Sequence, residues 1–313
     1  MYLSKKTIKT LKEKLKALNK LRPISNITLQ KIREQFQIEM TYNSNAIEGN
    51  TLTMQETFWV IQEGITIKGK PLKDHLEAKD HKEALEFLSE LIAKDKKVTV
   101  SEHLVRELHH LVVNKSQSNI AGKYRKGNVI ITGSKHKPPD GFEVPSKMRE
   151  FIKWFSENKN KHHVVELSAL IHHKLVHIHP FEDGNGRVSR LVMNLLILKS
   201  GYPLAIILRN DRKRYYRVLS EADEENYSGL CEFVAQSVIR SLNIYLKILT
   251  QKKKQKEKYI SLDELSKHSP YSSTYLRKLA TQGKLEAFKE GRNWLSSEKA
   301  LKDYIQSTNK KEK

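Results

Sequence analysis

The sequence HPFEDGNGRVSR, which runs from His179 to Arg190, indicates the fold and the chemistry of this protein more strongly than any other stretch. The helical run IHHKLVHIHP leads into it, and the apolar run VSRLVMNLLILKS, closed by Gly201, follows. We therefore expect a helix, a tight loop and a second helix. Gly184 and Gly186 allow the backbone to turn tightly and leave N–H groups uncovered at the start of the second helix, where a phosphate is favoured.

The charged side chains of this loop have the types that phosphate chemistry needs. Arg187 and Arg190 are three positions apart, on one helix face, and can fork to phosphate oxygens. Asp183 is a hard oxygen ligand suited to Mg²⁺, and His179 can accept a proton near pH 7. The combination predicts phosphoryl or nucleotidyl transfer. The alternative is a glycine turn between two core helices with incidental charges.

The same twelve residues match, at every defined position, the Fic family signature H-P-F-x-[D/E]-G-N-[G/K]-R-x-x-R. The resemblance covers about residues 1–245 and includes NVIITG at 128–133 and RKRYYRVL at 212–219. It implies a mainly α fold, a Fic-type helical bundle with a small β-hairpin flap, and transfer of AMP from ATP to a Ser, Thr or Tyr hydroxyl of a target protein. Doc-like kinases of this superfamily carry A-N-K where this chain has Gly184-Asn185-Gly186. The absence of A-N-K here favours AMP transfer.

The resemblance also implies a role for each residue of the motif. His179 would deprotonate the target hydroxyl, Phe181 would anchor the loop in the core, and Asp183 would hold Mg²⁺. The backbone around Gly184, Asn185 and Gly186 would shape an anion hole. Arg187 would meet the β-phosphate region of ATP, and Arg190 would meet the γ-phosphate.

A second motif, SNAIEGN at residues 44–50, resembles the Fic inhibitory motif [S/T]-x-x-x-E-[G/N] through Ser44, Glu48 and Gly49. Its place ahead of the catalytic core resembles the class with an N-terminal inhibitory helix. A Glu48 carboxylate paired with Arg190 would occupy the donors that the γ-phosphate needs. The alternative is a surface glutamate at a helix C-terminus, where the helix dipole disfavours an acid. The helix itself is predicted by a 3.6-residue apolar stripe of Leu29, Ile32, Phe36 and Met40.

Two further sets of residues are candidates for contacts with substrates. Ile130 and Ile131 lie where the family places its flap, whose edge can pair with an extended target segment, or the segment is a plain stabilising hairpin. Tyr215 and Tyr216 are candidates for the adenine pocket, with core packing as the alternative.

The density of histidines before the loop raises a competing interpretation as a metal hydrolase. His173 and His177 form an i, i+4 pair that can chelate a transition metal, with Asp183 as a third ligand. That interpretation leaves Pro180 and the Gly-Asn-Gly turn without a purpose. Histidines of helices in cores or at surfaces are commoner than metal ligands.

The last part of the chain reads as a separate unit. We expect a Lys-rich linker at 251–258 and a domain at 259–313, whose pattern over 259–307 resembles the winged helix-turn-helix of excisionase and MerR-type proteins. A first helix would hold Leu262 and Leu265, and a polar turn around 268–271 would lead to a second helix from Ser272 or Ser273. Arg277 and Lys278 on that second helix would contact DNA, and docking to a protein is the alternative.

Composition limits the remaining choices. The 313 residues carry 57 Lys and Arg against 36 Asp and Glu, a net charge of +21, which suits either nucleic-acid binding or plain solubility. The single cysteine, Cys231, excludes an intramolecular disulfide and a thiolate zinc cluster. With no apolar run of ~18 residues and no signal-like N-terminus, we expect no membrane contact and a cytoplasmic setting. We divide the Fic part into an N-terminal region at 1–95 and a catalytic core at 96–250.

The sequence therefore predicts an ATP- and Mg²⁺-dependent protein adenylyltransferase held down by Glu48. The alternative is a DNA-binding regulator whose Fic part modifies itself or removes AMP from a modified protein. The target protein is not identified by the sequence, and assembly into a homo-oligomer is left open.

Overall fold

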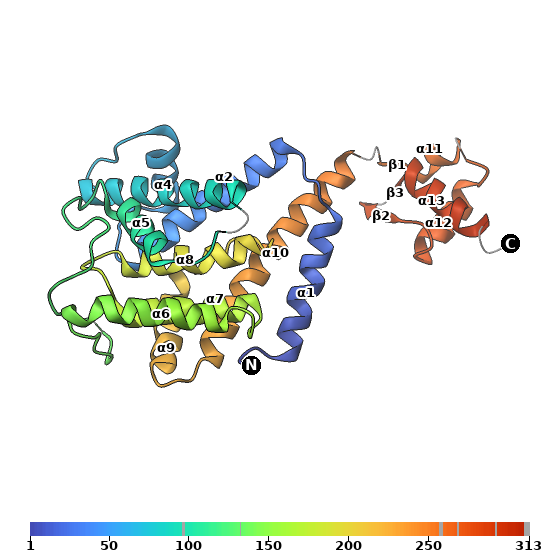
Figure 1. The fold of residues 1–313 in the computed structure, drawn as a ribbon. Coiled ribbons are helices and arrows are strands. Elements are labelled where there is room, and N and C mark those ends of the chain that lie inside the picture. Colours follow the sequence, from blue (N-terminus) through green and yellow to red (C-terminus); the bar gives the residue numbers. More distant parts are fainter. Residues whose placement is uncertain (96–97, 132, 257–258, 268, 292, 310–313) are drawn as a thin grey trace. The chain divides into compact units, whose positions relative to one another are not determined.

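The computed structural model describes residues 1–95, 98–131, 133–256, 259–267, 269–291 and 293–309, and it is mainly helical (Figure 1). The chain divides into two compact units, Met1–Tyr245 and Leu246–Lys313. Residues on both sides of position 95 belong to the first unit. Of the expected linker, residues 251–256 continue helix α10 (Ser228–Lys256), and residues 257–258 lie outside the described residues.

The first unit is built from helices and short helical turns. The N-terminal half contains α1 (Lys5–Lys20), α2 (Asn26–Ile47), α3 (Met54–Phe58), a π-helical turn (Trp59–Glu63), α4 (Leu72–Lys94) and α5 (Glu102–Val113). The C-terminal half contains a 3₁₀ turn (Gly141–Glu143), α6 (Val144–Asn158), α7 (Val164–Ile178), α8 (Asn185–Lys199), a second 3₁₀ turn (Arg209–Asp211), α9 (Arg212–Asp223) and most of α10.

Helix α8 forms the centre of this unit. Its residues from Arg187 to Ile197 are all buried, so it is covered on every side. Helices α2, α4, α5 and α7 contact it, and α6 packs on the outer side of α7 (Figure 1). Because α7 and α8 are consecutive and antiparallel neighbours, the loop that joins them lies at one end of the core, beside the helices that surround α8.

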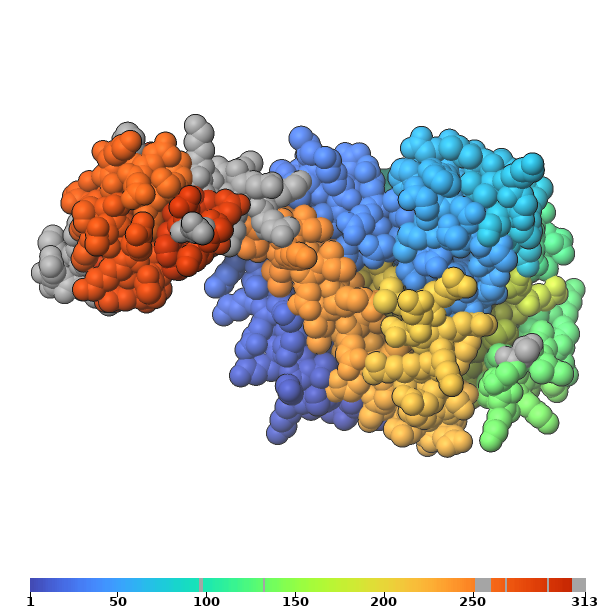
Figure 2. Space-filling model, turned by 180° about the vertical axis from the view of Figure 1, so that it is seen from behind, coloured from blue at the N-terminus to red at the C-terminus, as the bar shows by residue number. Residues whose placement is uncertain are grey.

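Helix α2 carries the first residues of the SNAIEGN motif, from Ser44 to Ile47, into the core. Ile32, Phe36 and Met40 of the predicted stripe are buried, and Leu29 is half-buried. The helix ends at Ile47, and Gly49 follows with φ = 103°, a conformation that glycine adopts easily. The predicted helix and its glycine stop are therefore confirmed. Figure 2 shows the surface near residue 210 next to the surface near residue 50, and the backbone N–H of Arg209 donates to Asn43 Oδ1 at 2.8 Å.

The predicted β-hairpin flap is not formed by the described residues: no strand is present in residues 128–131, and Thr132 lies outside the described residues. Side chains, rather than a strand ladder, tie the base of this loop together. Asn128 Oδ1 accepts a hydrogen bond from the backbone of Gly141 at 2.9 Å. The buried Arg125 donates to the carbonyls of Gly127 and Pro139 at 2.8 and 2.6 Å. These contacts replace the pairing that the β-prone run suggested.

After the end of α10, the described residues of the second unit form three short strands and three helices. They are β1 (Tyr259–Ser261), α11 (Leu262–Ser266), α12 (Ser273–Thr281), β2 (Ala287–Glu290), β3 (Asn293–Ser297) and α13 (Glu298–Asn309). The sheet is antiparallel in the order β1-β3-β2. Leu262, Leu265, Leu276 and Leu279 join one buried core, and the Ser272 hydroxyl caps α12 by accepting from Tyr275 N–H. The two predicted helices are present as α11, which holds Leu262 and Leu265, and α12, which begins at Ser273, although His268 of the turn between them lies outside the described residues.

Among the described residues, no helix combines the length and the apolar character that crossing a bilayer requires.

Candidate functional site

The loop between α7 and α8 is shaped by its proline and glycines. His179 is the C-cap of α7 and has the left-handed conformation, with φ = 50°, and Pro180, which has no N–H, cannot continue the helix. Gly184 has φ = 77°, and a Cβ there would lie 3.1 Å from Val113 Cγ1, so a larger residue would be strained and crowded. A non-glycine residue held at positive φ, as His179 is, stores strain of the kind that concentrates at functional sites.

Asn185 and Phe181 close the loop on itself. The Asn185 side chain donates to the Phe181 carbonyl at 2.8 Å and accepts from the Phe181 N–H at 2.9 Å. The Phe181 ring is fully buried and stacks on His109 with 3.7 Å between ring centroids. His109 Nε2 lies 3.1 Å from the carbonyl oxygen of Asp183, and its Nδ1 accepts from Gly122 N–H, so Nε2 is the donor. Burial lowers the pKa of His109 to about 4, which keeps this ring neutral.

The His179 imidazole is oriented by backbone contacts. Its Nδ1 lies 3.3 Å from the Val176 carbonyl, an arrangement that places the proton on Nδ1 and leaves Nε2 as an acceptor. The carbonyl of His179 accepts from Arg125 Nε at 2.7 Å, so Arg125 fixes both this residue and the neighbouring loop. Burial, helped by the charge of Arg125, lowers the pKa of His179, so the ring is a neutral base at pH 7.

Asp183 and Arg187 form a compact charged group at the start of α8. An Asp183 oxygen lies 3.2 Å from Arg187 Nη2, and Gln117 Nε2 donates to the same carboxylate. Burial alone would raise the pKa of Asp183, but Arg187 and Gln117 lower it to about 2. Arg187 is 1% exposed and also lies 3.3 Å from Glu77 through Nη1. Its Nε and Nη1 have no hydrogen-bond partner among the described residues.

Glu48 contacts Arg190 although nothing in the local sequence brings them together. Glu48 Oε1 lies 2.7 Å from Arg190 Nη2, which confirms the predicted hydrogen-bonding distance. Ser44 accepts twice from Arg190, from Nε through its hydroxyl at 2.9 Å and from Nη2 through its carbonyl at 2.8 Å. Burial would lower the pKa of Arg190, but the Glu48 carboxylate more than offsets this and raises it. Nη1 of Arg190 is buried and has no partner among the described residues, so the pair is not a two-pronged fork.

The Glu48 carboxylate also lies against the N-terminal turn of α8. A Cβ on Gly186 would stand only 2.1 Å from Glu48 Oε1. An anion is therefore already present where the N-terminus of a helix favours one. Asn185 and Gly186 are the first two residues of that helix, and Gly184 is its N-cap.

The two tyrosines of α9 have different surroundings. Tyr215 is 1% exposed, and its hydroxyl lies 2.8 Å from His172 Nε2, so it packs in the core. Tyr216 is 42% exposed and donates to the carbonyl of Ile47 at 3.3 Å, one residue before Glu48. The structure thus favours the core-packing alternative for Tyr215 and joins Tyr216 to the end of α2.

The remaining candidate residues lie on surfaces. Ile130 is 93% exposed and Ile131 is half-buried on the loop before α6. Arg277 and Lys278 are exposed on α12 of the second unit. The expected metal pair of His173 and His177 does not use Asp183: His173 Nε2 lies 2.9 Å from Asp223 Oδ1 instead.

Sequence reasoning missed several residues of this site. Glu77, His109, Gln117 and Arg125 come from α4, α5 and the loops after α5, far from the motif in sequence. They carry no local pattern that marks them. A buried arginine or glutamate is unusual, but burial is visible only in the fold.

Comparison with known proteins agrees with this geometry. Residues 99–197 match the Fic/DOC family. Curated relatives named protein adenylyltransferase Fic include one from Nematostella vectensis, 34% identical over 226 residues that make up 72% of this chain and 52% of the relative. Another, from Drosophila grimshawi, is 34% identical over 245 residues, 78% of this chain and 50% of the relative. The chain thus spans about half the length of the curated relatives it matches.

Solved structures share the fold of the first unit. A Fic domain containing signaling protein from Bacteroides thetaiotaomicron superposes with a TM-score of 0.72 and 29% identity, covering 77% of this chain and 97% of that one. Fic-1 from C. elegans gives a TM-score of 0.70 and 26% identity, covering 79% and 73%. The signature loop, the helices around it and these comparisons agree: residues 99–197 are similar in sequence to the Fic/DOC family, and the first unit is similar in fold to solved structures of Fic proteins.

Proposed function

We propose that the first unit is a protein adenylyltransferase, which moves AMP from ATP to a Ser, Thr or Tyr hydroxyl of a target protein. One observation carries this proposal. Within the part of the chain that the structure describes, buried guanidinium N–H groups of Arg187 and Arg190 have no hydrogen-bond partner at the start of α8, next to a neutral His179 and an ionised Asp183. Buried donors are normally satisfied, so these are suited to a ligand with several anionic oxygens. The relatives named protein adenylyltransferase Fic support the same reaction.

The chemistry follows from the positions of these groups. Nε2 of His179 accepts the proton of the target hydroxyl while its oxygen attacks the α-phosphorus of ATP. The bond from that phosphorus to the oxygen bridging to the β-phosphate breaks, and pyrophosphate leaves. Arg187 binds the β-phosphate region and Arg190 the γ-phosphate, so both stabilise the charge of the departing group. Asn185 keeps the loop closed, because both polar groups of its side chain are bonded to Phe181.

Asp183 fits the cation that accompanies a nucleoside triphosphate. Its carboxylate is ionised, 37% exposed and already surrounded by N–H donors and by Lys73 Nζ at 3.6 Å. Mg²⁺ is commonly held by one or two carboxylates and by substrate phosphates, and it would neutralise phosphate charge during transfer. In this proposal Asp183 exchanges its contact with Arg187 for the ion when ATP enters.

Glu48 keeps this site inactive in our proposal. Its carboxylate holds Nη2 of Arg190, and Ser44 holds Nε, so two of the three guanidinium nitrogens that could meet the γ-phosphate are occupied. The carboxylate also places a negative charge at the N-terminus of α8, where the phosphates would bind. ATP must displace Glu48 or bind with its phosphates out of line.

The loop before α6 is our proposed docking segment for the target. Ile130 is almost fully exposed, and Ile131 lies beside it on a segment whose described residues pair with no strand. An extended target segment could pair with this backbone and press on the two isoleucines.

Transfer of label from ATP tests the main proposal. The full chain carrying Glu48→Gly is incubated with a cell extract and with ATP labelled at the α- or the γ-phosphate. Label should reach protein only from the α-position, and intact-mass analysis should show a gain of one AMP. Transfer from the γ-position would mean kinase activity instead. If protein is labelled from neither position, the proposal is wrong.

We further propose that residues 259–307 form a winged helix-turn-helix that binds DNA. The support is the order of elements, with α12 capped by Ser272 and with Arg277 and Lys278 exposed on its surface. The unit also carries a net charge of +8 over residues 251–313.

A further inference from the structure

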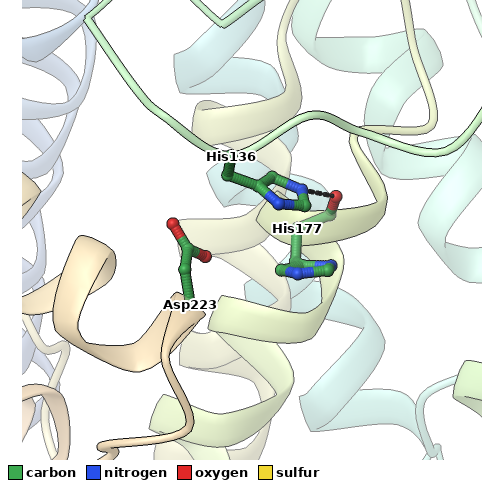
Figure 3. Close-up of side chains that lie close together, drawn as sticks. All are labelled: His136, His177 and Asp223. Carbon is green, nitrogen blue, oxygen red and sulfur yellow. Dashed lines mark hydrogen bonds between the residues drawn. The ribbon is translucent and has the colours of Figure 1, made fainter.

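A second group of metal-binding residue types lies outside the loop of the proposed active site. His136, His177 and Asp223 each offer a ligand atom, and these atoms lie within 4.8 Å of one another (Figure 3). They come from three different segments: the loop before α6, the end of α7 and the end of α9. All three residues are half-buried.

The second ring nitrogen of His136 and one carboxylate oxygen of Asp223 are already held by hydrogen bonds. His136 Nε2 lies 2.7 Å from the backbone carbonyl of His177, so it carries the proton and leaves Nδ1 as the free acceptor (Figure 3). Asp223 Oδ1 is bonded to His173 Nε2 at 2.9 Å, which leaves Oδ2. Metal-ligating histidines almost always donate their second nitrogen to a carbonyl or carboxylate, and ligating carboxylates are themselves hydrogen-bonded. His136 and Asp223 have this arrangement.

The space beside this group also suits an ion. A cavity of about 460 Å³ is lined by His173, His177 and Asp223, together with Trp154 and Tyr227. The nearby Lys174 ammonium lies over the Trp154 ring, 4.5 Å from its centroid.

We propose that His136, His177 and Asp223 bind one divalent transition-metal ion, with Zn²⁺ the best match, and that a water molecule completes its coordination. Two imidazoles and one carboxylate suit Zn²⁺ and its neighbours rather than Mg²⁺ or Ca²⁺. Bonds of about 2.0–2.1 Å in a tetrahedral site bring ligand atoms to roughly 3.4 Å apart. The three ligand atoms therefore close in by small side-chain rotations.

This site differs from both metal positions considered from the sequence. It uses His177 of the expected i, i+4 pair, but its partners are His136 and Asp223, while His173 supports Asp223 from behind. It also stands apart from the Mg²⁺ that we propose for Asp183. Metal binding here requires no AMP transfer, so it can be tested whether or not that activity exists.

The ion would link the loop before α6, through His136, to the end of α7, through His177. His136 is the member from that loop, and its flanking residues Lys135 and Lys137 are exposed. Binding energy that is available only when the loop is docked stabilises the docked state. Zn²⁺ is therefore expected to restrain the segment that also carries Ile130 and Ile131.

The binding test uses the untagged full chain after removal of metals with a chelator. Titration calorimetry with ZnCl₂, and metal analysis after dialysis, should give one equivalent of Zn²⁺. His136→Ala and Asp223→Asn should each weaken binding by at least tenfold, and His173→Ala by roughly tenfold, since losing a partner of a ligand costs about 10–100-fold. His103→Ala is the matched control, because His103 is an exposed histidine 3.4 Å from the carboxylate of Glu107. No binding by the parent protein, or equal binding by His136→Ala, overturns the proposal.

Limited digestion with trypsin gives a second measurement that does not depend on affinity. Zn²⁺ should slow cleavage after Lys135 at least several-fold in the parent protein and have no effect on Asp223→Asn. Cleavage after Lys94, far from the site in sequence, serves as the internal reference. An equal rate with and without Zn²⁺ would overturn the fastening of the loop.

Discussion

The carboxylate of Glu48 lies 2.7 Å from the guanidinium of Arg190, at the point where α2 ends against the N-terminal turn of α8. Ser44, one helical turn earlier, accepts two hydrogen bonds from the same arginine, and these bonds join residues 146 positions apart. The SNAIEGN motif and the loop between α7 and α8 thus meet through a single buried side chain, Arg190. If this contact restrains the enzyme, removing the carboxylate should release it.

Glu48→Gly should raise AMP transfer, including self-modification, by at least tenfold. Tenfold corresponds to ~1.4 kcal/mol of barrier, a modest share of what a charged contact to a buried arginine can supply. Glycine is well tolerated just after a helix, so the fold should be unaffected. Label from the α-phosphate of ATP measures the rate. Glu48→Gln is the matched variant, which keeps the size and removes the charge, and it should also be faster than the parent. Adding Arg190→Ala to Glu48→Gly should lose the gain, and an unchanged rate in Glu48→Gly would refute the inhibitory role.

His179→Ala, made in the Glu48→Gly background, should lower AMP transfer by ~10²–10⁴-fold, the usual contribution of a general base. ATP binding should change little, because Arg187 and Arg190 are left in place. Single-turnover rates and nucleotide titration separate the two effects. His110→Ala, a variant of an exposed histidine on α5, is the control. Retention of more than half of the rate would show that the proton goes elsewhere.

The pH dependence of the reaction should report a base with a lowered pKa. Burial lowers the pKa of His179, so the neutral ring dominates at pH 7 and the rate should be level there. As the pH falls through that lowered pKa, the ring is protonated and the rate should decline, with a midpoint below the ordinary value of about 6.5. Glu48 raises this pKa, so Glu48→Gly should move the midpoint lower still. A profile of kcat/KM whose acid limb lies above pH ~6.5 would contradict the assignment.

Asn185→Ala should destabilise the first unit by about 1–3 kcal/mol, because it leaves the buried N–H and carbonyl of Phe181 unpaired. Thermal unfolding should show a fall in Tm of roughly 2–4 °C per kcal/mol for a unit of this size. Asn158→Ala is the control: Asn158 makes a similar bond to the Trp154 carbonyl, but it is half-buried at the end of α6. An equal fall in Tm in the two variants would mean that the bonds between Asn185 and Phe181 stabilise the unit no more than an ordinary side-chain hydrogen bond.

Deletion of residues 251–313 should abolish retention of duplex DNA and leave AMP transfer intact. Arg277→Ala and Lys278→Ala in the full chain should weaken binding and reduce its salt dependence, because fewer counterions are released. Electrophoretic mobility shifts over a range of salt concentrations provide the measurement. Lys302→Ala, which removes an exposed lysine on α13, is the matched control. If the full chain binds no duplex, or binds it independently of salt, the unit docks to protein instead.

The parts of this fold that could be predicted are those set by local sequence. The apolar stripe of α2, the glycine stop at Gly49 and the serine cap of α12 depend on residues within a few positions of one another. The signature loop was equally clear, because its glycines and arginines lie together in the chain.

What the sequence did not reveal depends on distant contacts. Arg125 could not be recognised as the residue that holds His179, since that contact joins positions 54 apart. For the same reason the sequence did not show that the described residues 128–131 form no strand: their β-prone side chains favour strands, but Arg125 and Asn128 tie the base of the loop down in another way. Tyr215 and Tyr216 look alike in sequence, and only packing shows that one is buried and the other exposed.

The inhibited state that we propose, with Glu48 bound to Arg190, depends on the absence of a side chain at Gly186. The Glu48 oxygen occupies space that any Cβ at position 186 would fill, since the two would stand 2.1 Å apart. The glutamate tip is the movable partner, so even an alanine would push it aside and leave the backbone where it is. The residue at position 186 therefore decides whether Glu48 can make its contact with Arg190. A Fic domain with a larger residue there could keep its arginines and its histidine, but it would have to be silenced by something other than its own glutamate.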